Sequence, residues 1–283
     1  ISGYEHNAVT RPLHAIPGVE LLVARSPLFD RQGMIDSFRR CLDQGADAAV
    51  CTHVSNVFGF IFPIQEIAEL CRQREVPLIV DASQSAGVLP LDVQELGAAF
   101  VAMPGHKGLY GPQGTGLLLC NCDPTPILEG GTGSESLKQA MPQFLPDRLE
   151  AGTHNIAGVA GLLEGLRFLR RRDVRWIAGH ESRLIQRMGA GLSRLPGVEV
   201  FQASMPKVQS GVLSFRIKGK DCEDVGEALG DRGFALRAGL HCAPEAHRTA
   251  GTLDTGTVRL SFSHWNTREE VSRFLVAMGE ILR

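Results

Sequence analysis

The chain has 283 residues, of which 43% are hydrophobic and 21% charged, and its formal net charge at pH 7 is −2. These values describe a globular protein with a sizeable core, built as two domains or as one large and one small domain. The scattered charges form no basic stripe, which argues against nucleic-acid binding, and no apolar stretch reaches the ~20 residues that span a bilayer.

Seven cysteines, an odd number, lie mostly in apolar segments, which is typical of a reduced cytoplasmic protein and not of a disulfide framework. The chain begins at Ile1 without an initiator Met or a signal-peptide pattern. We therefore expect a cytoplasmic protein that binds neither nucleic acid nor membrane. We also expect that this sequence lacks the N-terminal segment of a longer polypeptide.

The first part of the chain alternates short apolar runs with helical patterns, which predicts βαβ units. Helical spacing of apolar residues predicts helices at 34–44 and 63–74, where Pro63 suits a helix start because its missing N–H costs nothing. Apolar runs predict strands at 20–24, 48–52, 77–81, 99–102 and 116–120. We expect an α/β fold in which residues 1–154 form part of a large domain with a mainly parallel sheet.

Residues 155–195 follow a helical pattern, and an interruption at 171–173 predicts two helices joined by a bend. These helices are expected to bridge the large domain to a smaller one. Beyond them, the pattern predicts strands at 198–201, 211–217 and 257–262 and helices at 222–232 and 268–282. Residues 196–283 should therefore form a small α+β domain.

Lys107 follows Pro104-Gly105-His106 and directly precedes a glycine-rich run at 108–116. It could be a surface lysine in a loop, but it has no neighbouring charge and stands beside glycines, which let backbone approach a bulky planar group. A lysine amine can form a Schiff base with an aldehyde, and a dry pocket favours its neutral form by lowering its pKa. The pattern therefore favours a functional lysine.

Asp81 ends the predicted strand 77–81, at the edge where open α/β sheets bind ligands. Alone it is most simply a helix N-cap. Together with Gln84 and Lys107, it favours a pyridoxal phosphate (PLP) site, because a carboxylate can keep a pyridinium nitrogen protonated. Ser55 and Asn56 also follow a strand end, although in isolation they are most simply turn residues.

Near the C-terminus, Cys242 stands among Gly, Pro and His, which predicts an exposed thiol that Arg237 and His241 could stabilise as a thiolate. The alternative is a metal site of His241, Cys242 and His247, which is disfavoured because no second cluster supplies further ligands. Arg259 interrupts an apolar strand, either as a residue facing solvent at a sheet edge or as a planar fork for a carboxylate.

These segments together resemble the class V, fold-type I PLP enzymes, and within them the cysteine desulfurases of the group II kind. Each motif is weak alone, but their joint order and spacing are specific, and the resemblance covers nearly the whole chain. The motifs are Thr52-His53-Val54-Ser55-Asn56, Asp81-Ala82-Ser83-Gln84-Ser85, Gly105-His106-Lys107, Glu150-Ala151-Gly152-Thr153 and Arg237-Ala238-Gly239-Leu240-His241-Cys242.

The resemblance implies how the ring of PLP would be held. His6 would stack on the pyridine ring, and Asp81 would pair with the ring nitrogen. Gln84 would bond the phenolic oxygen, with Asn56 close by. Lys107 would hold the cofactor as a Schiff base and serve as base and acid.

The resemblance also implies contacts for the phosphate and the substrate. His106 would touch the phosphate, and Thr153 would reach the phosphate of a neighbouring subunit, which implies a homodimer. Arg259, with Arg237, would grip the substrate carboxylate, and Cys242 would attack the substrate sulfur and become a persulfide. The family's phosphate-binding Gly-Thr turn would lie upstream of Ile1. Pro104, where many relatives carry a hydroxyl residue, removes one phosphate contact or stiffens the turn.

Three readings of this resemblance stay open. The first is a cysteine desulfurase that converts L-cysteine to alanine and passes sulfur to an acceptor protein, for example in iron–sulfur cluster assembly. The second is a selenocysteine lyase, acting on L-selenocysteine, or another class V aminotransferase-type enzyme, although a plain aminotransferase has no need for Cys242. The third is a truncated, non-catalytic chain that acts in dimerisation or in binding a sulfur acceptor.

Overall fold

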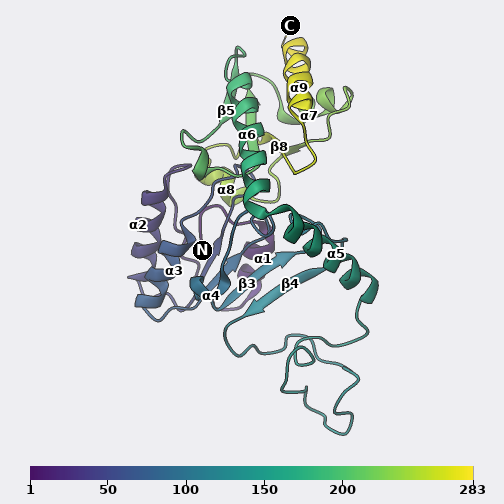
Figure 1. Ribbon diagram of the computed structural model, residues 1–283. Coiled ribbons are helices and arrows are strands. Elements are labelled where there is room, and N and C mark those ends of the chain that lie inside the picture. The colour runs from purple at the N-terminus through teal and green to yellow at the C-terminus, as the bar shows by residue number, and fades with distance from the viewer. Residues whose placement is uncertain (283) are drawn as a thin grey trace.

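The computed structural model describes residues 1–282, which form two sheets that each have their own hydrophobic core (Figure 1). In the first sheet, the strands β1 (Ala49–Thr52), β2 (Leu78–Asp81) and β3 (Phe100–Pro104) are parallel. The fourth strand, β4 (Gly116–Cys120), runs antiparallel to β3, because the connection between them contains no helix to make a parallel crossover. The predicted α/β fold with a mainly parallel sheet is confirmed.

Four helices belong to this first body: α1 (Asn7–Ala15), α2 (Arg31–Leu42), α3 (Ile64–Gln73) and α4 (Val93–Leu96). The predicted helices at 34–44 and 63–74 correspond to α2 and α3. Asp30 caps α2 by accepting the N–H of Gly33 at 2.8 Å, and Pro63 occupies the N-cap position of α3. Helices α1 and α4 were not predicted from the sequence.

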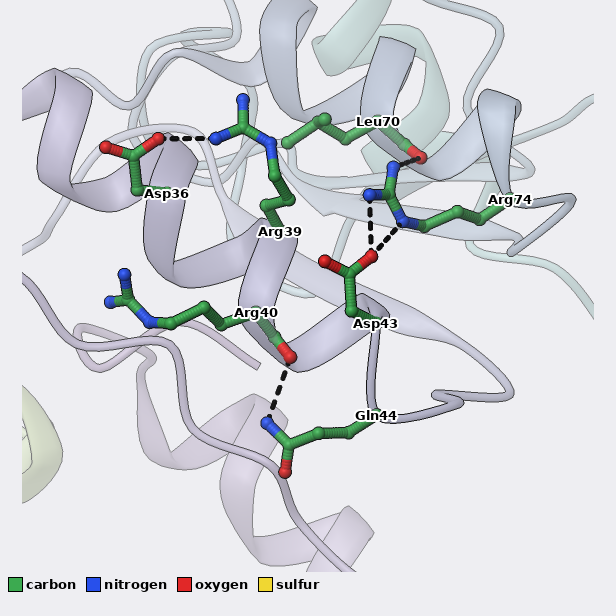
Figure 2. A network of polar contacts seen from close by, with 7 residues as sticks. All are labelled: Asp36, Arg39, Arg40, Asp43, Gln44, Leu70 and Arg74. Carbon is green, nitrogen blue, oxygen red and sulfur yellow. Dashed lines mark hydrogen bonds and ion pairs between the residues drawn. The ribbon is translucent and has the colours of Figure 1, made fainter.

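A polar network ties the C-terminal ends of α2 and α3 together (Figure 2). Arg74 donates to one carboxylate oxygen of Asp43 through Nε and Nη2, at 2.8 and 2.7 Å, and through Nη1 to the Leu70 carbonyl at 3.2 Å. Along α2, Arg39 pairs with Asp36 at 2.6 Å. Such exposed pairs are worth about 1 kcal/mol at most, so they orient the two helices more than they stabilise them.

The prediction of a strand at 20–24 was wrong. Only Ala24 forms a bridge, to Ser2, and the segment is held through the N-terminal residues: Gly3 N–H donates to the Ala24 carbonyl and Ala24 N–H to the Ile1 carbonyl, both at 2.8 Å. A cavity of about 590 Å³ separates residues 18–22 from residues 46–50, so no neighbouring strand pairs with this apolar run among the described residues.

Two helices lead from the first body to the second: α5 (Ile156–Arg172) and α6 (Val174–Leu192). The predicted break between them is confirmed. Asp173 adopts a left-handed backbone (φ 68°) that ends α5, and its side chain caps α6 by accepting the Arg175 N–H at 2.9 Å.

The second sheet is antiparallel, in the order β5 (Val198–Phe201), β6 (Val212–Ile217), β8 (Thr257–Ser261) and β7 (Arg237–Gly239). The predicted strands at 198–201, 211–217 and 257–262 and both predicted helices are present, whereas the strand β7, the helix α8 (Pro244–Ala250) and a short 3₁₀ turn at Pro206–Val208 were not predicted. The two predicted helices are α7 (Cys222–Gly230) and α9 (Arg268–Ile281).

Candidate functional site

Asp81 stands at the C-terminal end of β2, between the neighbouring strand ends, with Thr52 of β1 on one side and Ala102 of β3 on the other. One carboxylate oxygen accepts the N–H of Ser83 at 2.8 Å. The side chain therefore closes a local turn, and this bond fixes its position. No helix begins between Asp81 and α4, so Asp81 is not the helix N-cap of the alternative interpretation.

The Lys107 turn packs directly on this loop. Tyr110 N–H donates to the Lys107 carbonyl at 2.9 Å and closes the turn. A Cβ on Gly108 would lie 2.3 Å from the Ala86 carbonyl, and one on Gly87, which has φ 77°, would lie 2.0 Å from the Gly108 carbonyl. Because only glycines allow this backbone contact, the turn that carries Lys107 sits against the loop that follows Asp81.

Lys107, Gln84 and Arg259 line one cavity of about 340 Å³. This volume lies within the range of small-molecule sites. Burial lowers the pKa of Lys107 and the positive charge of Arg259 lowers it further, while Asp81 opposes both. Lys107 nevertheless stays accessible to solvent, so its amine can meet a ligand entering the cavity.

His6 lies close enough to Lys107 and Asp81 for their charges to act on its imidazole. It is the N-cap of α1, where its Nδ1 accepts the N–H of Ala8 at 3.0 Å, so its ring orientation is fixed. Burial and the charge of Lys107 lower its pKa, and Asp81 acts in the opposite direction. A neutral imidazole is therefore held beside the lysine and the carboxylate.

The Cys242 loop is fastened to this neighbourhood through its backbone. The Cys242 carbonyl accepts the N–H of Asn7 at 2.7 Å, and the His241 carbonyl accepts the side-chain amide of Asn56 at 2.9 Å. His241 and Cys242 both have left-handed backbones, with φ of 52° and 55°. This strained turn holds the Cys242 thiol free and exposed at the junction of the two bodies.

Arg259 links the same segments. Its Nη1 donates to the Asn56 carbonyl at 2.9 Å, whereas its Nε is buried without a partner among residues 1–282. Burial and the neighbouring Arg237 lower its pKa, and Cys242 raises it. Arg259 is therefore partly buried beside the cavity, and the alternative of a solvent-facing edge residue does not describe it.

Other predicted residues lie elsewhere or have different partners. His106 and Thr153 are exposed and do not line the cavity, and Thr153 belongs to the long connection between β4 and α5. Arg237 is exposed opposite Arg259 in the sheet. The Asn56 amide, expected near a cofactor, is bonded to the His241 carbonyl instead.

In each histidine of the metal alternative, one ring nitrogen has a partner, whereas His241 Nδ1 and His247 Nε2 are buried without one among residues 1–282. His241 Nε2 lies 3.1 Å from both oxygens of Thr257, and His247 Nδ1 lies 2.8 Å from Thr252 Oγ1. Over the described part of the chain, no three His, Cys, Asp or Glu side chains gather closely enough to hold a metal ion.

Two buried carboxyls were missed by the sequence reasoning. Glu5 accepts Ser2 Oγ at 2.5 Å and the Thr52 N–H at 2.8 Å, and burial raises its pKa to about 7. Glu181 on α6 lines the cavity with Lys107 and Arg259. Its signal was visible in the sequence, since it interrupts the apolar stripe of Ile177, Leu184, Ile185 and Met188 at a core-facing position.

Comparisons with known proteins show the family of this chain. The sequence profile of the family described as "Aminotransferase class-V" matches residues 1–274. A "Probable cysteine desulfurase" of Mycolicibacterium paratuberculosis is 35% identical over 99% of this chain and 42% of its own length. One of Methanothermobacter thermautotrophicus is 34% identical over 93% of this chain and 67% of its own length.

Two solved structures have the same fold. The apo cysteine desulfurase of Thermococcus onnurineus superposes with a TM-score of 0.88 at 31% identity, over 99% of this chain and 71% of that one. The cysteine desulfurase CsdA of Escherichia coli, in an S-sulfonic acid form, gives 0.84 at 27% identity, over 99% and 71%. The chain spans between 42% and 67% of the length of the curated relatives named above. None of the helices within residues 1–282 is long and apolar enough to cross a membrane.

Proposed function

Because the chain belongs to the class-V aminotransferase family, we propose that it carries the lysine, thiol and arginine of a PLP-dependent cysteine desulfurase. The observation that carries the proposal is that Lys107 and Arg259 line one cavity, while Asn56 bonds both Arg259 and the Cys242 loop. The substrate would be L-cysteine, with alanine and a persulfide on Cys242 as products.

The residues present fit PLP. The cavity offers a lysine with a lowered pKa and an arginine whose buried Nε lacks a partner among residues 1–282, and Asp81 lies near enough to act on the charge of that lysine. Asp81 would meet the ring nitrogen, Gln84 the phenolic oxygen, and His6 the ring face. When bound, the cofactor supplies an electron sink for charge at the substrate Cα. His106 would reach its phosphate, and Pro104 would shape the turn in front of it.

The chain's own groups divide the remaining work. Lys107, whose pKa is lowered by burial, would act as the base for the Cα proton. Arg259 can turn its free Nε toward the substrate carboxylate, and Arg237 adds positive charge beside it. The Cys242 thiolate attacks the substrate sulfur: an S–S bond forms, the C–S bond breaks, and the substrate carbon keeps the electron pair and takes a proton to give alanine.

The proposed enzyme is a homodimer. The connection at 121–155 extends away from the sheet without a helix or strand (Figure 1), and Leu137 on it is 100% exposed. The adjoining face of α5 also leaves Ile156, Val159 and Leu163 uncovered. Apolar surface of this extent is typical of an interface, and in a dimer Thr153 would reach the partner's cofactor phosphate. All seven cysteines are free, which suits a cytoplasmic location.

The test is conversion of L-cysteine to alanine and persulfide in the presence of PLP. Lys107→Ala should lose the visible chromophore of lysine-bound PLP and all turnover. Cys242→Ala should keep the chromophore and lose persulfide and sulfide release, and loss of both together would contradict the separate roles. Faster turnover of L-selenocysteine would favour a lyase. No chromophore in excess PLP would favour a non-catalytic chain that binds a sulfur acceptor.

A further inference from the structure

A buried carboxyl that the proposed chemistry does not use lies in the wall of the site cavity. Glu181 is 3% exposed and lines the cavity with Lys107 and Arg259. Burial alone shifts the pKa of Glu181. Among the described residues, neither a hydrogen bond nor an opposite charge contributes to this shift. A carboxyl in this position is costly when ionised and can remain only as a neutral acid or with water beside it.

Glu181 stands where three segments meet. It belongs to α6, its Oε2 lies so close to Gly211 that a Cβ there would be 2.2 Å away, and its charge acts on Tyr110 of the Lys107 turn. Gly211 directly precedes β6, the neighbour of the strand β8 that carries Arg259. The carboxyl therefore fills the seam between the turn that presents Lys107 and the sheet that presents Arg259.

The charged and titratable groups around this seam do not neutralise a carboxylate. From the first body these are Lys107 and Tyr110, from β8 it is Arg259, and from α6 and the loop after β8 they are His180 and His264. Burial lowers the pKa of His264 and of Lys107 and raises that of Tyr110. Burial is the cause that acts on Glu181 itself, and it raises the pKa of this carboxyl to about 8.

We infer that Glu181 is a positioning residue: as a neutral acid it keeps the seam between the Lys107 turn and the Gly211 segment closed, and its ionisation opens the seam. In the closed form, Lys107 and Arg259 face one cavity. In the open form, water reaches the carboxylate, and the two cations no longer face a common ligand. The inference rests on the proposed function only in treating this cavity as the substrate site.

The chain contains its own probe of this seam. Its only two tryptophans, Trp176 and Trp265, lie beside it and are 46% and 65% exposed. Trp176 stacks on His180, next to Glu181, and both tryptophans contact His264, at centroid distances of 5.1 and 4.7 Å. Opening of the seam should therefore change the tryptophan emission of the protein without any cofactor or substrate.

The experiment is a titration of tryptophan emission from pH 7 to pH 10 in the chain without PLP. We expect a single transition with a midpoint near the pKa of about 8 in the wild type and its loss in Glu181→Gln, which stays neutral. Glu164→Gln, which removes an exposed glutamate paired with Arg167, is the matched control and should keep the transition. Lys107→Met should also keep it, which excludes the lysine as the titrating group.

A second variant keeps the inference falsifiable if Glu181→Gln folds poorly. Gly211→Ala adds a methyl group that must displace the flexible Glu181 carboxyl toward water, so its transition should move to lower pH. A flat wild-type titration, or an unchanged midpoint in Glu181→Gln, would overturn the inference. Because the readout needs no PLP, failure of the chromophore test leaves this result intact. If turnover is measured, the pH profile of Glu181→Gln should lack the decline above pH 8 that the wild type shows.

Discussion

The side-chain amide of Asn56 donates to the backbone carbonyl of His241 at 2.9 Å, across 185 residues of sequence. Asn56 follows β1 in the first body, and His241 immediately precedes Cys242 in the second. The same Asn56 offers its own carbonyl to Arg259. One residue of the first body thus fixes both the arginine and the backbone of the exposed thiol, although the two bodies have separate cores.

Asn56→Ala should loosen the Cys242 loop. A buried hydrogen bond contributes about 1 kcal/mol, and its loss should raise the open population of the loop about fivefold. The measurement is the rate at which iodoacetamide alkylates Cys242, followed by peptide mass mapping, since Cys122 is also exposed and serves as an internal reference. Asn121→Ala removes a comparable amide bond to the Ala98 carbonyl, at 2.8 Å, and should leave the Cys242 rate unchanged. Equal alkylation rates in wild type and Asn56→Ala would show that this hydrogen bond does not hold the Cys242 loop.

Gly108→Ala should separate the Lys107 turn from the loop that follows Asp81. The new Cβ would lie 2.3 Å from the Ala86 carbonyl, which is backbone and cannot rotate away. Overpacking of this kind costs about 1–3 kcal/mol, so urea unfolding should shift to lower midpoints and PLP binding should weaken. Gly131→Ala is the control, because a Cβ there meets nothing within 4 Å. Unfolding and PLP affinity equal to the control would show that the close contact is not required.

Arg259→Lys should separate binding from catalysis. Lysine keeps the positive charge and loses both the planar fork and the Nη1 bond to the Asn56 carbonyl. A lost charge-assisted hydrogen bond is worth about 1.5–3 kcal/mol, which predicts a rise in KM for cysteine of roughly 10- to 100-fold with a smaller change in kcat. Arg216→Lys, in an exposed pair with Glu199, is the control. An unchanged KM would remove Arg259 from the substrate site.

The elements that the sequence predicted correctly are those in which local pattern and burial agree. The strand ending at Asp81 is an apolar run that the sheet buries, and the break at Asp173 follows from a polar interruption that suits a helix cap. The segment 20–24 has the same apolar character but lacks a paired neighbour, and pairing is a property of the fold and not of the segment.

The residues of the candidate site also separate into those that the sequence singled out and those that it did not. Lys107 and Arg259 share a cavity because glycine contacts and sheet order bring them there, and the chemical oddity of each residue was enough to single it out. The bond from Asn56 to His241 could not be anticipated, since it depends on how the second body docks on the first. Glu5 and Glu181 escaped notice because a glutamate in a helix or beside a turn is ordinarily exposed.

The buried Glu181 should make stability depend on pH in a direction opposite to that of a salt-bridged acid. Burial raises its pKa from an ordinary 4.5 to about 8 in the folded chain. Between these two pH values the folded state holds a proton that the unfolded state has released, so the contribution of this residue to stability falls as pH rises. Below pH 4.5 both states are protonated and the residue has no such effect.

Glu181→Gln removes this penalty, because glutamine is neutral in both states. The shift corresponds to a difference on the order of 5 kcal/mol between the two ends of the window, as an upper bound. The variant should therefore gain more stability over wild type at pH 8 than at pH 5, measured by urea unfolding at each pH. Comparing each variant with wild type at the same pH cancels the titration of other groups, including Glu5. The control, Glu164→Gln at an exposed position, should show no such pH-dependent gain in stability. An equal gain at both pH values in Glu181→Gln would mean that Glu181 ionises normally in the folded chain.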